Sequence, residues 1–166
     1  MKKNIAKAKE LWNTARHAAM ATVNADGSPH NTPFQFMRDP EFKYVYWASY
    51  PEALHSQNVL RTRKIFFVLY DSVNTEKGGL YISAEEGHVL EGDELIRALA
   101  IYNPLRAKEG KGPLTPEYYS GGTPQKMWSA KITHLWINHP TRDATGRLNK
   151  NTRQEISAAD LLNQGT

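Results

Sequence analysis

The sequence contains no cysteine, and this absence excludes several kinds of chemistry. Disulfides, thiolate metal sites and a cysteine nucleophile all require a thiol. The six histidines show no spacing typical of a metal site, such as His-Glu-x-x-His, so the sequence predicts no metal site. Redox chemistry in this protein would therefore need a bound cofactor.

Long apolar runs are missing as well. No stretch approaches the roughly 20 apolar residues that a membrane-spanning helix needs. The first residues, Met1-Lys2-Lys3, lead into polar positions and not into the apolar core of a signal peptide. We therefore expect a cytoplasmic protein without a membrane partner. With 166 residues, the chain is long enough for one domain with its own core.

Charge of one sign is not concentrated along the chain. The 21 Lys and Arg residues are interspersed with 17 Asp and Glu residues, which leaves a net charge of +4. This distribution favours an anionic small-molecule ligand over a nucleic-acid partner. An ordinary surface with a mild basic bias explains the same numbers.

Apolar periodicity predicts a helix over Asn4–Arg16, followed by an antiparallel meander with turns at Asp26-Gly27 and Asp39-Pro40. Pro33 lacks a ladder donor, so we expect it at an edge or where the sheet opens, and an ordinary edge proline remains the simpler alternative. The run Lys64–Tyr70 is dense in β-branched and aromatic residues, which predicts a central strand buried on both faces. The predicted strands cover Ala18–Val23, His30–Met37, Lys43–Ala48, Lys64–Tyr70, Leu80–Ala84 and Gln125–Asn138.

The segment after the third strand carries hydroxyl, amide and imidazole groups. Ser49-Tyr50-Pro51-Glu52 predicts the start of a helix, because Pro51 suits the first turn and Ser49 and Glu52 have the spacing of a capping box. A helix N-terminus attracts anions, and His55, Ser56 and Gln57 follow within two turns. The hypothesis is that this segment holds a phosphate. A capped surface helix with these side chains in water is the alternative.

The second half of the chain is less regular. A helix is predicted over Asp93–Lys108, with Pro104 ending or kinking it. Glu109–Pro124 holds four glycines and three prolines, so we interpret it as a mobile or partner-facing loop that does not pack as an element. In the last strand, we expect one face to carry Trp128, Ala130, Ile132, His134 and Trp136.

The composition turns polar after His139, and this change suggests a boundary. We expect residues 1–139 to form one domain and residues 140–166 to form a polar extension. The extension either packs on the domain or on a partner subunit, or is partly disordered. A short helix near its end is predicted from Ser157 and Asp160, which have cap spacing.

The order of these pieces resembles the pyridoxamine 5'-phosphate oxidase-like, FMN-binding split barrels. The matching segments, which together cover about Ile5 to His139, are MATVNADGSPHNTPF, YWAS, HSQNVLRTRKIFFVLYDS, GGLYISAEEGHV with DELIRALAIYN, and KMWSAKITHLWINH. Each segment is short, and their order and spacing carry the resemblance. It implies a mainly β fold, a split β-barrel of about six antiparallel strands with flanking helices, in an obligate homodimer.

The resemblance also implies one FMN per subunit, bound in a cleft at the dimer interface. The cofactor-binding residues that it implies are Thr32, Pro33 and Phe34 along the flavin ring, Ala48 and Ser49 near the ribityl phosphate, His55 in the place of a frequent lysine, Ser56 and Gln57 after it, and Trp128 reaching the partner's flavin. Thr32 and Met37 stand where the vitamin oxidase has basic residues, and its arginine and histidine pair has no match. The implied function is therefore an FMN-dependent oxidoreductase for an unidentified small molecule, with no catalytic side chain assigned.

Two alternatives remain open at this point. The same barrel can serve as a non-catalytic module that holds a flavin, haem or a related tetrapyrrole, with one of the six histidines as an axial haem ligand. A deazaflavin is the alternative to FMN as the flavin cofactor. A barrel that binds single-stranded nucleic acid would use Phe34, Tyr44 and Tyr46 as stacking faces, with phosphates held by Arg61, Arg63 and Lys64.

Overall fold

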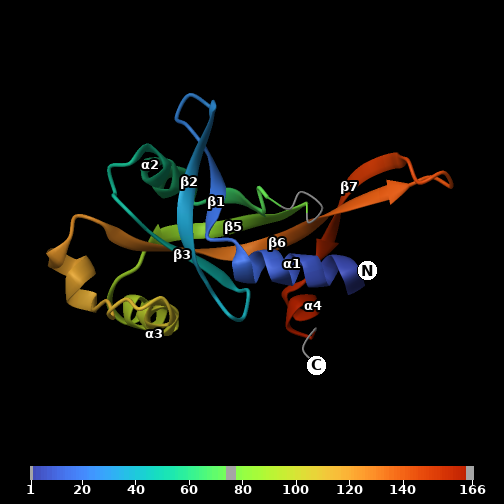
Figure 1. Ribbon diagram of the computed structural model, residues 1–166. Helices are drawn as coiled ribbons and strands as arrows, with labels where there is room; N and C mark the ends of the chain where they lie inside the picture. Colours follow the sequence, from blue (N-terminus) through green and yellow to red (C-terminus); the bar gives the residue numbers. More distant parts are fainter. Residues whose placement is uncertain (1, 74–77, 164–166) are drawn as a thin grey trace.

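The computed structural model describes residues 2–73 and 78–163 (Figure 1). Its strands form one antiparallel sheet in the order β3-β2-β1-β4-β5-β6-β7, and β3 also pairs with β6. This second pairing closes β1 to β6 into a six-stranded barrel, which confirms the predicted fold class. The strands are β1 (His17–Val23), β2 (Pro29–Arg38), β3 (Tyr44–Ser49), β4 (Ile65–Tyr70), β5 (Gly79–Val89), β6 (Lys126–Arg142) and β7 (Leu148–Ile156). The helices are α1 (Lys2–Thr14), α2 (Leu54–Thr62), α3 (Gly92–Lys108), the π-helix η2 (Tyr118–Gly122) and α4 (Ala158–Leu162).

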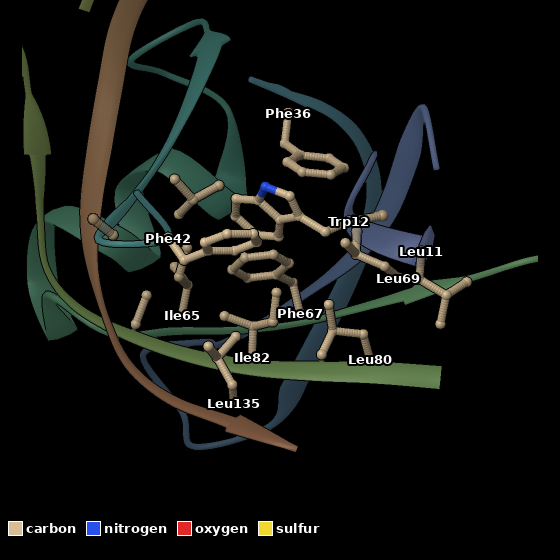
Figure 2. Packing of buried hydrophobic residues seen from close by; sticks show 14 of the residues in the cluster. Leu11, Trp12, Phe36, Phe42, Ile65, Phe67, Leu69, Leu80, Ile82 and Leu135 are labelled. Carbon is tan, nitrogen blue, oxygen red and sulfur yellow. The ribbon is translucent and has the colours of Figure 1, made fainter. Parts of the chain in front are cut away.

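The core lies inside the barrel and continues under α1. Alternate residues of each strand point inward, so that Phe67 and Ile82 pack centrally, as Figure 2 shows. The apolar stripe of α1 contributes Trp12, whose ring centre lies 5.7 Å from that of Phe36 and 5.1 Å from that of Phe42. The predicted amphipathic helix is thus confirmed as a packing helix.

A second, smaller core lies outside the barrel. Met37 of β2 and Tyr46 of β3 point away from the barrel interior and pack under α3, through residues such as Leu95 and Leu99. Met127 of β6 joins the same cluster. The outer surface around Met37 and Tyr46 is therefore covered by α3.

Strands β2 and β3 separate soon after they pair. Their register joins only three positions, which begin with Phe36 opposite Trp47. From there back to Pro29, β2 is paired with β1 and has no register with β3. Pro33 and its neighbours therefore lie on a strand edge beside an opening in the sheet, as predicted.

The prediction that β4 is buried on both faces is wrong for the single chain. Ile65, Phe67 and Leu69 are buried, whereas Phe66 and Val68 are only half-buried on the opposite face. The apolar composition does not distinguish the two faces, and only the curvature of the barrel decides which face is inside.

The predicted common face of β6 is also wrong beyond Ile132. Ala84 lies opposite Ile132, but Ser83 lies opposite His134, so one extra residue is inserted in β6. Such a bulge reverses the alternation of the side chains that follow it. Trp136 consequently faces outward, while Leu135 and Ile137 are buried inside.

The helix after β3 begins later than predicted. Ser49 still pairs with Lys126 in the ladder between β3 and β6, and α2 starts at Leu54 with Ala53 as its N-cap residue. The predicted capping box of Ser49 and Glu52 is therefore wrong. The backbone of Ser49 belongs to strand β3. A turn with a hydrogen bond from Ala53 N to Tyr50 O lies between this strand and α2.

Two further predictions concern the second half of the chain. Helix α3 covers Gly92–Lys108, which confirms the predicted helix over Asp93–Lys108, and it continues through Pro104, so the proline does not end it. The segment Glu109–Pro124 is not wholly irregular, because η2 lies within it and buries Tyr119 against the second core. Of the predicted polar loop Ser72–Gly79, residues 74–77 lie outside the described residues.

The last part of the chain packs on the barrel. Strand β6 passes through His139 and forms a long hairpin with β7, which projects from the barrel in Figure 1. The chain then returns, and Ile156 and Leu161 are buried in the main core. The predicted cap at Ser157 is confirmed, since its Oγ accepts a hydrogen bond from Asp160 N at 3.1 Å. Within the described residues, no helix is long and apolar enough to cross a membrane.

Candidate functional site

Three of the predicted phosphate-binding side chains meet where β3 ends and α2 begins. Ser49 Oγ lies 2.7 Å from His55 Nε2, and Ser56 Oγ donates a hydrogen bond to Ser49 Oγ at 3.1 Å. Ser56 is fully buried and Ser49 nearly so, while His55 is half-buried. The cluster is therefore a polar site at the edge of the core.

Hydrogen bonds from distant strands hold this cluster in place. Trp128 Nε1 of β6 donates to the carbonyl oxygen of Ser49 at 3.1 Å. Asn58 of α2 is buried and donates from Nδ2 to Thr22 Oγ1 of β1 at 3.1 Å and to Asn24 Oδ1 at 2.8 Å. These bonds hold the end of β3 against β6 and α2 against β1, so the site lies between two fixed elements.

The cluster has the donor chemistry of an anion site. The N–H groups of Leu54, His55 and Ser56 lie in the first turn of α2, where no carbonyl of the same helix can accept from them. The helix dipole adds a partial positive charge at this end. Together with the hydroxyl group of Ser49 and the imidazole of His55, these donors fit the oxygens of a phosphate.

The electrostatic state of His55 follows from its surroundings. Burial lowers the pKa of His55 below its ordinary value of 6.5, and the positive charge of a protonated His30 lowers it further. At neutral pH the imidazole is therefore uncharged and shares a hydrogen bond with Ser49 instead of acting as a permanent cation.

We predict that the protein without ligand loses stability as the pH falls through about 6.5, the pKa of an unfolded histidine. Because the folded pKa of His55 is lowered, the unfolded chain binds more protons in this range, and the free energy of unfolding falls with pH. Urea denaturation between pH 7.5 and pH 5 would measure this slope. The variant His55→Gln should have a shallower slope, while the exposed control His17→Gln should keep it; equal slopes in all three proteins would contradict the assignment.

A cleft with a volume of about 300 Å³ lies beside the point where β2 and β3 separate. Gln35 and Ala48 line it and are the first positions of the two strands beyond their last paired residues. Its size lies at the lower end of the range of small-molecule sites. The other lining residues come from β2, α3, η2 and their loops: Met37, Tyr102, Arg106, Leu114, Tyr118, Tyr119 and Gln125.

The predicted site residues fall into separate groups. Ser49, His55 and Ser56 form the polar cluster described above, and Ala48, next in the chain, lines the cleft. The three residues that were expected along the flavin ring lie on the free edge of β2: Thr32, Pro33 and Phe34. The side chain of Phe34 itself points into the core, so only its backbone is available at that edge.

Two predicted residues lie elsewhere. The side chain of Gln57 is exposed and donates to the carbonyl oxygen of Pro51 at 2.7 Å. Trp128 is fully buried in the barrel, stacked on Trp47 with ring centres 6.1 Å apart. It therefore supports Ser49 from inside and cannot reach the flavin of a partner subunit, because its ring has no access to the surface.

The aromatic wall of the cleft was missed by the sequence analysis. Tyr102 and Arg106 lie four residues apart on α3 and hence on one helix face, with the guanidinium 5.6 Å from the ring centre. That spacing is visible in the sequence and could have indicated a polar helix face. Tyr119 is buried, which raises its pKa to about 12, so its hydroxyl group stays protonated.

Comparison with protein families identifies the fold and its family. The sequence model of the pyridoxamine 5'-phosphate oxidase family matches residues 5–111, which is more than half of the chain. The chain belongs to this family. The match includes β1 to β5, α2 and α3, and therefore contains both the polar cluster and most of the cleft.

Solved structures share the fold of this family member at low sequence identity. A heme binding protein from Mycobacterium smegmatis has a TM-score of 0.62 and 13% identity, over 95% of this chain and 59% of that chain. The heme storage protein HutZ from Vibrio cholerae has a TM-score of 0.56 and 17% identity, over 78% of this chain and 90% of that chain. A protein from Clostridium acetobutylicum related to general stress protein 26, of the pyridoxinephosphate oxidase family, has a TM-score of 0.59 and 12% identity, with 94% and 96% covered. The search of curated proteins finds no match.

Proposed function

We propose that this member of the pyridoxamine 5'-phosphate oxidase family is an FMN-binding flavoprotein that acts as an oxidoreductase on a small molecule. One observation carries the proposal. The free edge of β2, the cleft beside it and the polar cluster at the start of α2 all adjoin the end of β3. A flat ring system and a phosphate would each find a suitable surface there.

The phosphate end would be held by the polar cluster. Ser49 supplies a hydroxyl group that the buried Ser56 holds in place, His55 supplies an imidazole, and the first turn of α2 supplies N–H groups. These donors are uncharged or only partly charged at neutral pH. We therefore expect the phosphate to raise the pKa of His55, because an anion favours the protonated imidazole.

The ring end would lie along the free edge of β2. Backbone N–H and C=O groups of Thr32 to Phe34 have no partner on β3 and suit the alternating donors and acceptors of a flavin. Bound FMN would supply hydride or electron transfer. The side chains that line the cleft would position a substrate there and exclude water. Tyr102 and Arg106 of α3 line the cleft together with Gln35 of β2.

We also propose that the protein is a homodimer that buries the outer face of its barrel. Strand register places five apolar side chains side by side across neighbouring strands: Pro33, Ala19, Val68, Tyr81 and Trp136. The three large residues of this row are only half-buried in the single chain. The row starts at the free edge of β2, so a second copy placed on it would also shield the ring site from water.

The absorption spectrum of the purified protein, recorded before and after addition of FMN, tests the proposed function. We expect flavin bands that remain with the protein after gel filtration. A Ser56→Ala variant should bind FMN about tenfold more weakly, because the buried hydroxyl that donates to Ser49 Oγ and holds it in place is lost. Ser28→Ala, in the exposed turn between β1 and β2, is the control. Absence of flavin bands, together with no effect of FMN on tryptophan fluorescence or melting temperature, would refute the proposal.

A non-catalytic haem-binding module is the second candidate, and a specific observation favours it. His17 lines an open cleft of about 390 Å³ with an apolar floor that includes Leu11 and Ala18. In the described part of the chain, His17 is exposed and no hydrogen-bond partner of its ring is found. The same spectra distinguish the candidates, since a Soret band after haem addition that disappears in His17→Ala would support haem.

A further inference from the structure

The hairpin of β6 and β7 carries most of the net charge of the protein. We call residues 139–154 the arm; it projects from the barrel in Figure 1. Four exposed basic side chains stand in the arm against a single carboxylate, that of Asp143, which leaves a net charge of +3 out of +4 for the whole chain. The basic residues are Arg142, Arg147, Lys150 and Arg153. In the described chain, none of them has an ion-pair partner, and the Arg153 guanidinium lies 3.7 Å from the ring centre of Tyr81.

The opposite end of the same sheet is acidic. We call residues 85–94, where β5 ends and α3 begins, the corner; this stretch has no Lys or Arg. Its carboxylates belong to Glu85, Glu86, Glu91, Asp93 and Glu94. Three of these carboxylates take part in exposed pairs with Lys64, Lys131 and His88, which contribute little to stability.

The arm and the corner lie at similar distances from the middle of the outer face. Tyr81 and Trp136 are paired in the register of β5 and β6 and mark this middle. Along β6, Arg142 lies six residues beyond Trp136, and along β5, Glu86 lies five residues beyond Tyr81 in the other direction. At about 3.3 Å per residue, both separations are roughly 17 to 20 Å.

We propose that two copies pack with their outer faces together about a two-fold axis near the Tyr81 and Trp136 row, so that the arm of each copy lies on the corner of the other. When the axis lies in the interface and runs along this row, across the strands, the rotation exchanges equal distances on either side of it and brings each basic end onto an acidic end. This inference rests on the homodimer proposed above and adds the contact that sets its orientation.

A second copy explains the charges better than a nucleic acid does. The acidic corner on the same molecule would repel a phosphate backbone, whereas it complements an arm of the same chain. Both arm contacts form at once in a two-fold dimer, which closes the assembly without free charged ends. A head-to-tail arrangement would instead leave an arm and a corner free and continue into chains.

A charge-exchange experiment by sedimentation velocity tests the contact. Arg147→Glu with Lys150→Glu changes the net charge of the arm from +3 to −1, and Glu86→Lys with Glu91→Lys changes that of the corner from −5 to −1. All four side chains are exposed. We expect each double variant alone to dimerise at least tenfold more weakly than the wild type at low salt. A mixture of the two should form heterodimers more tightly than either double variant forms homodimers. In the heterodimer one contact joins a wild-type arm to a wild-type corner, and the other brings the introduced glutamates to the introduced lysines.

The outcomes separate this contact from the dimer itself. A wild-type protein that stays monomeric at all concentrations would refute the homodimer and this inference together. A dimer whose affinity is unchanged in both double variants, with no preference for the heterodimer, would refute only the arm contact. Salt-dependent binding of a labelled oligonucleotide that the arm variant loses, without any effect on dimerisation, would assign the arm to nucleic acid and overturn the proposal.

Discussion

Replacement of Trp128 by alanine is expected to lower the free energy of unfolding by about 3 to 5 kcal/mol. Its side chain is fully buried, stacks on Trp47 at an interplanar angle of 15°, and donates to the carbonyl oxygen of Ser49. The alanine variant loses this packing, leaves a large cavity and removes the hydrogen bond from Nε1 to the carbonyl oxygen of Ser49. Urea denaturation followed by circular dichroism would measure the change.

The variant Trp128→Phe separates packing from hydrogen bonding. Phenylalanine keeps most of the apolar volume but has no N–H group, so we expect a loss of about 1 to 3 kcal/mol from the unsatisfied carbonyl of Ser49 and the smaller ring. A loss below 1 kcal/mol for Trp128→Ala would show that the barrel collapses around this position. Equal losses in both variants would show that the hydrogen bond, and not the packing, dominates.

Trp128 also shows what the sequence could and could not predict. Alternation in β6 correctly indicates that Trp128 and Ala130 share the inner face. The bulge opposite Ser83 and Ala84 then reverses the pattern, and no local residue type announces it, because the bulge depends on how β6 fits β5. The orientation of Trp136 therefore required the structure.

The start of α2 illustrates the same limit. Ser49 and Glu52 have the spacing of a capping box, but the long-range ladder with Lys126 keeps Ser49 in β3. A local sequence pattern cannot show that strand pairing competes with helix capping at Ser49, because the pairing partner lies far away in the chain. The contact of Ser49 with His55 could nevertheless be predicted from the sequence, because the two residues are only six positions apart, at the end of a strand and the start of the next helix.

The cleft is different, because its walls come from distant parts of the chain. Gln35 of β2, Tyr102 of α3 and Tyr118 of η2 meet only after the barrel has closed and α3 has packed on its outer side. Sequence resemblance correctly gave the family, and hence the barrel, from the order of short segments. The resemblance did not predict that α3 lines the cleft, because the position of α3 depends on how it packs against the barrel.

Replacement of Gly87 by alanine is expected to destabilise the protein by about 1 to 3 kcal/mol and to weaken FMN binding. A Cβ atom at Gly87 would lie 2.5 Å from Val59 Cγ1, so α2 would have to move away from β5. Gly87 N also donates to the carbonyl oxygen of Arg63 at 3.0 Å, which ties the end of α2 to the same strand. Displacement of α2 would shift His55 and Ser56 against Ser49, because these two residues lie on the helix and Ser49 on β3.

The matched control for this variant is Gly112→Ala. A Cβ atom at Gly112 would meet nothing within 4 Å, and its φ angle is not in the left-handed region, so we expect stability and FMN affinity close to those of the wild type. Urea denaturation and flavin titration should be performed on both variants. If Gly87→Ala loses stability but retains full FMN affinity, the polar cluster at the start of α2 is not the phosphate site, because the helix that carries it would have moved without consequence. If Gly87→Ala loses neither, β5 and α2 can separate at no cost, and the close approach of Val59 does not position the site.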